Sequence, residues 1–247
     1  YDQNSDHPSS STPLVMASVS SQTSNGLSAS ESKPDHALPV KISHLAASAT
    51  AQSSSTALDA PPPTIPLANA AQITKLQHHL DRHHGERFIL VIQDFPDPDA
   101  LSSAWAFQLI AAQYEIQCDI VYAGTLSHQE NIALVKLTGL PAKRLGASTL
   151  KDCDLSDYQG CVLVDSQGTN SQLMPLVKAV HIPIVVVIDH HSQQNVEDFQ
   201  DAFVDIRPQS RATATILTEY LQGGLLDFNN SNPIHVKCAT ALMHGIR

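Results

Sequence analysis

From residue 87 onward the chain carries short apolar runs separated by stretches of mixed polarity. The runs at 88–92 (F-I-L-V-I) and 182–188 (I-P-I-V-V-V-I) are continuous rather than alternating, and they are rich in β-branched residues. Such runs are typical of strands buried on both faces of a parallel sheet. The pattern predicts strands over 88–92, 118–123, 160–164, 184–188 and 203–206, with a short strand near Leu145.

The stretches between these runs have helical spacing. They predict helices over 100–114, 128–137, 171–179, 212–221 and 233–244. Ser210 or Thr213 is suited to cap the fourth helix, and Asn232 followed by Pro233 is a typical start for the last. Strands that alternate with helices predict an α/β fold, here a twisted and mainly parallel sheet with helices on both faces. Right-handed crossovers would bring the carboxyl ends of its strands to one edge.

The N-terminal part of the chain has a different composition. Residues 1–71 are dominated by Ser, Ala, Thr and Pro, and residues 2–87 contain no Phe, Trp or Tyr. Because such a segment buries too little apolar surface to offset its ordering entropy, we predict that 1–71 is disordered. Residues 72–86 then form a short amphipathic helix or linker, and 87–247 form the folded domain.

Four histidines gather in the predicted helix 72–86, and Ile73, Leu76 and Leu80 share one of its faces. The spacing of the histidines invites a metal-site interpretation. No strand end or carboxylate cluster fixes their geometry, so we expect a solvated helix face instead. The histidines are His78, His79, His83 and His84.

Carboxylate and imidazole side chains follow three of the predicted strands. They are Asp97, Asp99, Asp165, Asp189, His190 and His191. Open α/β folds bind their ligands at this edge of the sheet. Clustered carboxylates repel one another unless a cation lies among them, and oxygen and imidazole donors suit a hard or borderline divalent metal. The sequence therefore predicts a metal site, and a pair of metals there would suit displacement at phosphorus.

Plain structural roles are an alternative for some of these residues. Asp99 would cap the helix that follows it, Asp94 would be solvated, and a single Asp after a strand, such as Asp165, would serve a turn. No comparable role presents itself for Asp97.

In their order and context these motifs resemble the DHH phosphoesterase superfamily. The resemblance rests on D-P-D-A before a helix, then V-D-S, then V-I-D-H-H, and it covers about residues 87–247. The superfamily includes RecJ-type exonucleases, small-oligonucleotide and phosphoadenosine phosphatases, cyclic-dinucleotide phosphodiesterases and family II inorganic pyrophosphatases. The resemblance implies a phosphoesterase that hydrolyses short oligonucleotides, cyclic dinucleotides or nucleoside bisphosphates by two-metal activation of water.

The resemblance also implies roles for individual residues and for the metal. Asp165 would bridge two metals, Asp97 and Asp99 would hold one each, and the triplet from Asp189 to His191 would complete the site. One imidazole of the triplet would bind metal, and the other would contact the scissile phosphate or orient a ligand. The implied metal is Mn²⁺, with Mg²⁺ or Co²⁺ as alternatives.

Two features depart from the family pattern. Gln93 stands where the first motif usually begins with His, and an amide offers only a carbonyl oxygen to a metal. The family's fourth motif, A-L-x-x-G-I followed by T-D-T, is matched only as A-L-M-H-G-I-R at 241–247. We therefore expect a fragment, incomplete at its C-terminus and without the family's substrate-binding domain.

These departures keep other classes of function open. One is a nucleotide- or metal-binding regulatory module without catalysis. Another is a phosphoacceptor receiver domain, since Asp94 and Asp165 follow strands, but such a domain needs a Lys after a later strand, where D-H-H stands.

Charge bears on the partner. A formal net charge of −10 argues against a sequence-independent grip on duplex nucleic acid and fits a small nucleotide or short single-stranded oligonucleotide held by metal. Arg207 and Arg211 are candidates to contact a substrate phosphate, with solvated loop arginines as the alternative. A homodimer is compatible with the resemblance.

Cysteine usage and hydropathy bear on location. The cysteines show no C-x-x-C spacing and are expected to be reduced core residues, as in an intracellular protein; they are Cys118, Cys153, Cys161 and Cys238. No apolar run is long enough for a membrane span. We expect a cytoplasmic protein.

Overall fold

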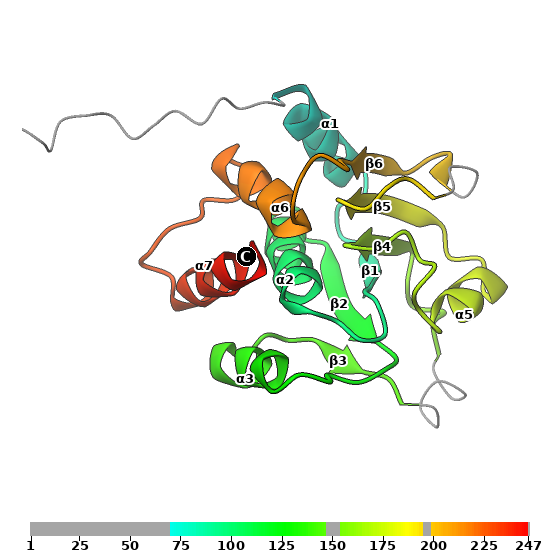
Figure 1. Cartoon of the computed structure of the whole chain (residues 1–247). Helices are drawn as coiled ribbons and strands as arrows, with labels where there is room; N and C mark the ends of the chain where they lie inside the picture. Colours follow the sequence, from blue (N-terminus) through cyan, green and yellow to red (C-terminus); the bar gives the residue numbers. More distant parts are fainter. Residues whose placement is uncertain (1–69, 147–153, 195–198, 247) are drawn as a thin grey trace, which may run out of the picture. The chain divides into compact units, whose positions relative to one another are not determined.

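The computed structural model describes residues 70–146, 154–194 and 199–246 (Figure 1). The predicted disordered segment 1–71 lies outside the described residues except for its last two, Ala70 and Ala71, which begin a helix. Cys153 also lies outside them.

The described residues form an α/β fold around a six-stranded sheet with the order β3-β2-β1-β4-β5-β6. All of its strand pairs are parallel, as the continuous apolar runs predict. The strands are β1 (Arg87–Val91), β2 (Gln117–Tyr122), β3 (Lys143–Arg144), β4 (Gly160–Val164), β5 (Ile184–Asp189) and β6 (Phe203–Ile206).

Both faces of the sheet are buried, and successive strand residues alternate between two hydrophobic clusters. Along β1, Phe88 and Leu90 belong to one cluster, whereas Ile89 and Val91 belong to the other. Because side chains in a strand point to opposite faces in turn, a strand covered on both sides must be apolar at every position. This explains why the runs are continuous.

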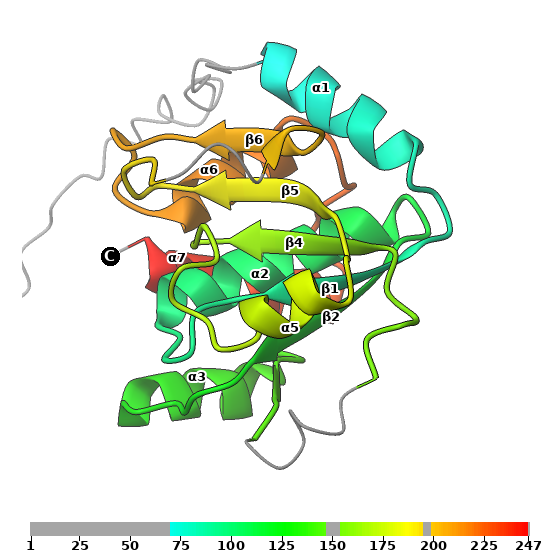
Figure 2. The same ribbon diagram turned by 90° about the vertical axis from the view of Figure 1, so that its right-hand side faces the viewer.

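Helices supply the two covering layers, and Figure 2 shows α5 in front of the sheet with α2, α6 and α7 behind it. Residues of α1, α2, α6 and α7 join the larger cluster, and Met174 and Val177 of α5 join the smaller one. The helices are α1 (Ala70–Asp81), α2 (Pro98–Ala112), α3 (Gln129–Thr138), α5 (Met174–Ala179), α6 (Thr213–Gln222) and α7 (Pro233–Gly245).

Helix α1 is a packed part of this fold, since Leu76 and Leu80 are fully buried in the larger cluster. The expected solvated histidine face is wrong for His79, which is 5% exposed and lies beside the rings of His83 and Phe203. Burial and the neighbouring His83 and Arg82 lower the pKa of His79 to about 4, so it is neutral at pH 7. Sequence periodicity placed His79 on the polar side, but the apolar face of α1 is wide enough to include it.

Two helix starts differ from the expected ones. Helix α5 begins at Met174 rather than at 171, with Pro175 in its first turn. Neither Ser210 nor Thr213 caps α6, whose N-cap position is Ala212 and lacks a side-chain cap of its own. The start of α7 is as predicted, because the Asn232 side chain accepts a hydrogen bond from Ile234 N–H at 2.9 Å.

The strand order creates a switch point between β1 and β4. From β1 the chain moves outward through β2 to β3, then returns to β4 and moves outward the other way through β5 to β6. The loops that follow β1 and β4 therefore diverge and leave a crevice at the carboxyl edge of the sheet, where such folds bind ligands. All the predicted ligand residues are on segments that begin at this edge.

Among the described residues, none of the helices has the length and apolar character needed to cross a membrane.

Candidate metal centre

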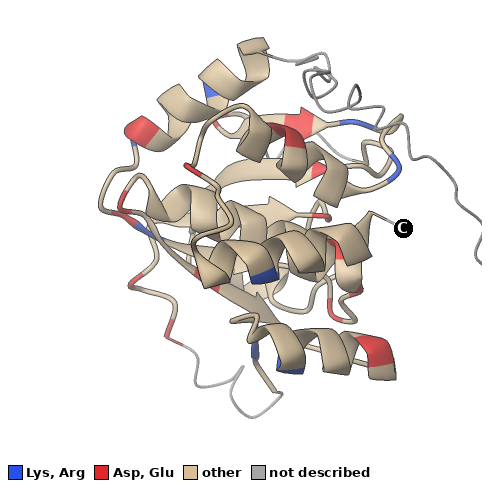
Figure 3. Cartoon of the chain, turned by 90° about the vertical axis from the view of Figure 1, so that its left-hand side faces the viewer, with Lys and Arg blue, Asp and Glu red and all other residues tan. Residues whose placement is uncertain are grey.

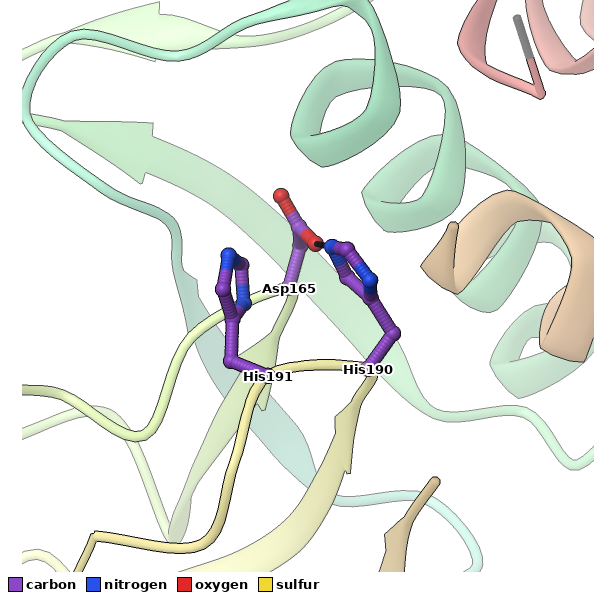
Figure 4. Close-up of side chains that lie close together, drawn as sticks. All are labelled: Asp165, His190 and His191. Atoms are coloured by element: carbon purple, nitrogen blue, oxygen red, sulfur yellow. Dashed lines mark ion pairs between the residues drawn. The ribbon is translucent and has the colours of Figure 1, made fainter. Parts of the chain in front are cut away.

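Three side chains from two adjacent strand ends converge at this edge. Asp165 follows β4, and His190 and His191 follow β5, which pairs with β4. One ligand atom from each lies within 4.8 Å of the other two. Figure 4 shows all three side chains pointing away from the strands that carry them, toward the same space. The two imidazole rings are 4.3 Å apart between centroids.

The backbone at Asp165 directs its side chain to this space. Asp165 has a φ of 57°, in the left-handed region, and its N–H donates to the Ile188 carbonyl at 3.0 Å. Asp and Asn are the non-glycine residues that tolerate this conformation best, because their short polar side chains bond locally. Asp165 is 3% exposed, and its carboxylate accepts from the Thr213 hydroxyl at 2.9 Å. Uncommon backbone angles at buried polar residues are frequent in functional sites.

Asp189 organises the turn that carries the two histidines. Its Oδ1 accepts from the backbone N–H groups of His190 and His191, at 2.8 and 3.2 Å, and lies 2.8 Å from His191 Nδ1. Its Oδ2 accepts from Gln167 Nε2 at 2.8 Å. Since the Nδ1 side of His191 faces this carboxylate, Nε2 is the nitrogen left for a ligand. A direct metal bond from Asp189 stays a prediction, because both of its oxygens already have partners.

The sequence offers Asp99 as the cap of α2, but Asp97 has this role in the structure. Asp97 is the N-cap of α2, where its Oδ1 accepts from Ala100 N–H at 2.9 Å. Asp99 instead accepts from Thr213 N–H at 2.9 Å and Ala214 N–H at 2.7 Å. It thus caps α6 from a neighbouring helix, which explains why α6 lacks a cap of its own. The helix starts at Pro98 because Pro fits the first helical position, and this shifts the cap to Asp97.

Asp99 also borders the cluster. The Nε2 atom of His190 lies 3.5 Å from Asp165 Oδ1 and 3.6 Å from Asp99 Oδ2. Asp97 is exposed, and only one of its carboxylate oxygens is used by the cap. The structure therefore brings Asp99, Asp165, His190 and His191 together, with Asp97 on the solvent side of the same loop.

The electrostatics of the cluster favour a cation. Burial, together with the neighbouring Asp99 and Asp97 carboxylates, raises the pKa of Asp165 well above its usual range. Burial also raises the pKa of Asp99, against the opposing effect of its hydrogen bonds to α6. Ionisation of these buried carboxylates is unfavourable when no cation is near, and a bound cation would make it favourable.

The donor set fits a divalent metal. Asp165, His190 and His191 offer one oxygen and two imidazole nitrogens within ligand-sharing distance, as Mn²⁺, Co²⁺ or Zn²⁺ accept. The rigid Asp189 and Gln167 bonds behind them are the kind of support that orients ligands in metal sites.

The arginine candidates lie differently. Asp205, on β6, binds the Arg207 guanidinium at 2.7–3.0 Å, and Glu219 of α6 also contacts it. Carboxylates on β6 and α6 therefore already bind the Arg207 guanidinium. Its contact with a substrate phosphate stays a prediction, which this arrangement does not support. Arg211 is exposed directly before the start of α6.

Sequence reasoning missed two supporting residues, Gln167 and Thr213. The Gln167 amide joins Asp189 to the backbone of Ser192 and Gln194. Thr213 was considered only as a cap, although its hydroxyl and its N–H bind Asp165 and Asp99. The only signal for them was proximity in sequence to a strand end or a helix start.

The chain is similar to one protein family and to individual proteins of known sequence or structure. The model of the DHH family, N-terminal domain, matches residues 88–246. An uncharacterized protein of Methanocaldococcus jannaschii, MJ1633, is 35% identical over 153 residues, which are 62% of this chain and 28% of that protein. A crystal structure of an exopolyphosphatase-related protein from Bacteroides fragilis superposes with a TM-score of 0.48 and 14% identity, over 71% of this chain and 49% of the other.

The chain thus spans less than a third of the archaeal relative and about half of the solved structure. Because the family model covers more than half of the chain, including the two strand ends that carry Asp165, His190 and His191, the chain belongs to the DHH family through its N-terminal domain.

Proposed function

We propose that this domain hydrolyses small phosphoesters with divalent metal bound at Asp165, His190 and His191. The observation that carries the proposal is the convergence of these three side chains at the switch point of a DHH-family domain. Mn²⁺ is the metal we favour, with Mg²⁺ and Co²⁺ as alternatives, because the donors are a mixture of oxygen and imidazole nitrogen.

Each residue near the cluster has a defined task in this proposal. Asp165, His190 and His191 would hold the metal, and Asp99 and Asp97 would contribute carboxylates toward a second one. A bound metal pair would supply Lewis-acid polarisation of the phosphoryl group and a water of lowered pKa. Asp189 holds both histidines in place, and Thr213 fixes the Asp165 carboxylate.

The proposed substrate class rests on charge. The cluster lies at the carboxyl edge of the sheet, and in the view of Figure 3 the Lys and Arg segments are scattered over the ribbon. With a net charge of −10, long-range attraction of a polyanion is weak, so metal must provide most of the grip on phosphate. Short oligonucleotides, cyclic dinucleotides and nucleoside bisphosphates are the substrates we propose.

The test is Mn²⁺-dependent hydrolysis of a panel that contains a dinucleotide, a cyclic dinucleotide, a nucleoside bisphosphate and pyrophosphate. Asp165→Asn and His190→Ala should each lower kcat by about 100-fold or more, since each removes a ligand. Asp201→Asn and His78→Ala are matched controls, because both side chains are exposed outside the cluster. Full activity in Asp165→Asn, or turnover that ignores metal, would overturn the proposal.

A second candidate is a binding module that holds metal and nucleotide without turnover. It is favoured by Gln93 in place of the family's His, and by the hydrogen bonds that both Asp99 oxygens accept from α6. Isothermal titration with Mn²⁺, with and without nucleotide, separates the two. Tight binding that Asp165→Asn abolishes, with no turnover on the panel, would select the binding module.

A further inference from the structure

A concave surface lies at the same edge of the sheet as the metal centre. It has a volume of about 490 Å³, and its lining comes from the loop after β1 and the loop between β4 and α5. These loops leave neighbouring strand ends (Figure 2). The lining residues are Gln93, Asp94, Phe95, Thr169, Asn170, Ser171 and Gln172.

We propose that this surface, which we name the Phe95 pocket, binds a nucleobase of the substrate whose phosphate lies at the metal centre. The inference rests on the proposed function and assigns a binding surface to the base of the nucleotide substrate. It is carried by an exposed aromatic ring on a rigid loop, by the unpaired amide of Gln93, and by the absence of Lys and Arg from the lining.

The Phe95 ring is exposed although the residues on both sides of it are fixed. Phe95 is 62% exposed, whereas Asp94 is 7% exposed. Asp94 N–H donates to the Asn170 carbonyl at 3.0 Å, and the Pro96 carbonyl accepts from Asn131 Nδ2 at 3.1 Å. Because the residues on both sides of Phe95 are held in this way, the loop needs little ordering when a flat ligand stacks on the ring.

The floor of the pocket is equally well held. The expectation of a solvated Asp94 is wrong, because its carboxylate accepts from Gln172 N–H at 3.2 Å and Gln172 Nε2 at 2.9 Å. The Asp94 carbonyl packs so closely on Gly124 that a Cβ there would lie 2.0 Å from the oxygen. The two loops are therefore fixed relative to the sheet before a ligand arrives.

The polar lining suits the edge of a base rather than another phosphate. The Gln93 amide has no hydrogen-bond partner among the described residues, so it offers both a donor and an acceptor. No Lys or Arg lines the pocket, and the Asp94 carboxylate lies at its floor. An additional phosphate would meet repulsion there, whereas a neutral heteroaromatic ring with donors and acceptors at its edge would not.

A chain of hydrogen bonds connects the pocket to the metal centre. Thr169, on the pocket wall, donates to the Gln194 side chain at 2.8 Å. Gln194 N–H donates to the Gln167 side chain, which in turn donates to Asp189, the residue that holds both histidines. A base in the pocket and a phosphate at the cluster would thus be positioned by one connected framework.

The test compares a 5′-phosphorylated dinucleotide with an analogue in which both bases are replaced by hydrogen, under Mn²⁺. The wild-type protein should prefer the dinucleotide in kcat/KM by about 5- to 150-fold, the worth of stacking one base. Phe95→Ala should bring this ratio close to one through a higher KM for the dinucleotide, and Phe95→Trp should restore it. Leu137→Ala, which removes an exposed apolar side chain from α3, should keep the wild-type ratio.

Binding of AMP and ribose 5-phosphate by calorimetry provides a readout that does not need turnover. AMP should bind more tightly than ribose 5-phosphate to the wild-type protein, and Phe95→Ala should remove the difference. The Phe95 pocket would be overturned if the wild-type protein bound AMP and ribose 5-phosphate equally well. An unchanged kcat/KM ratio in folded Phe95→Ala would also overturn it, and neither result would contradict the hydrolysis itself. Absence of hydrolysis with retained AMP preference would instead overturn the proposed function and keep the pocket.

Discussion

At the residue scale, the centre depends on two aspartates with different tasks. Asp165 directs its carboxylate into the cluster from a left-handed backbone position. The Asp189 carboxylate instead forms hydrogen bonds within the histidine turn. One has a raised pKa caused by burial and like charge; the other has hydrogen bonds to both of its oxygens. Substitutions at the two positions should therefore have opposite effects on stability.

Asp189→Asn should lower both stability and metal affinity. The amide keeps one acceptor oxygen but directs an NH₂ group at donors that now lack a partner, at a cost of about 1–3 kcal/mol. Loosening of the histidine turn should weaken Mn²⁺ binding by about 10- to 100-fold. Thermal melts and metal titration measure both effects. If Asp189→Asn binds Mn²⁺ as the wild-type protein does, the turn does not depend on this carboxylate.

Asp165→Asn should stabilise the metal-free protein at pH 8 by about 1–3 kcal/mol, or roughly 2–10 °C. Folding raises the pKa of Asp165, so ionisation in the folded state costs stability as pH rises through that pKa. Asn removes this cost and keeps both the left-handed backbone and an acceptor for Thr213. The gain should vanish near pH 4, where the folded carboxyl is protonated.

Melts of both proteins across pH 4–8 with chelator test this sign. Asp201→Asn, on an exposed segment, is the control and should show no such trend. A gain for Asp165→Asn that does not vary with pH would show that packing rather than charge is responsible.

At the element scale, helix α6 depends on Asp99 of another helix for its first turn. Asp99→Ala should destabilise the protein by about 0.5–2 kcal/mol, as loss of a helix cap does, and it should also weaken Mn²⁺ binding. Asn232→Ala removes the cap of α7 and is the matched control, with a similar loss of stability and unchanged metal affinity. If the two variants bind Mn²⁺ equally well, Asp99 serves α6 alone.

Elements and motifs were largely predictable from the sequence, but contacts between distant residues were not. The strand ends at Asp165 and Asp189 followed from buried apolar runs, because a parallel sheet covered on both faces leaves little choice of composition. The cap of α6 by Asp99 was not predictable, since it joins residues 114 positions apart. The contact of Asp94 with Gln172 also joins residues that are distant in sequence. Local propensity gives no information on either contact.

At the scale of the whole molecule, burial controls the chemistry of the cysteines. Cys118, Cys161 and Cys238 are free and buried, and burial raises the pKa of each thiol. In a Cys153→Ser variant, we expect only slow reaction with a thiol reagent in native buffer and complete reaction in denaturant. Because modification must wait for opening of the core, the native rate reports the free energy of the opening that exposes each thiol. Fast modification in native buffer would contradict this burial.

The pairing of β1 with β4 affects the order in which the domain folds. Arg87 N–H donates to the Gln159 side chain, 72 positions later, and the strands between these points pair on the far side of β1. Closing a loop of this length is slow compared with forming helices. The ligand residues can come together only after β1, β4 and β5 have paired, so the cluster forms late during synthesis. If the proposed site binds Mn²⁺, binding should appear only after β1, β4 and β5 have paired, and it would then report the completion of this part of the sheet.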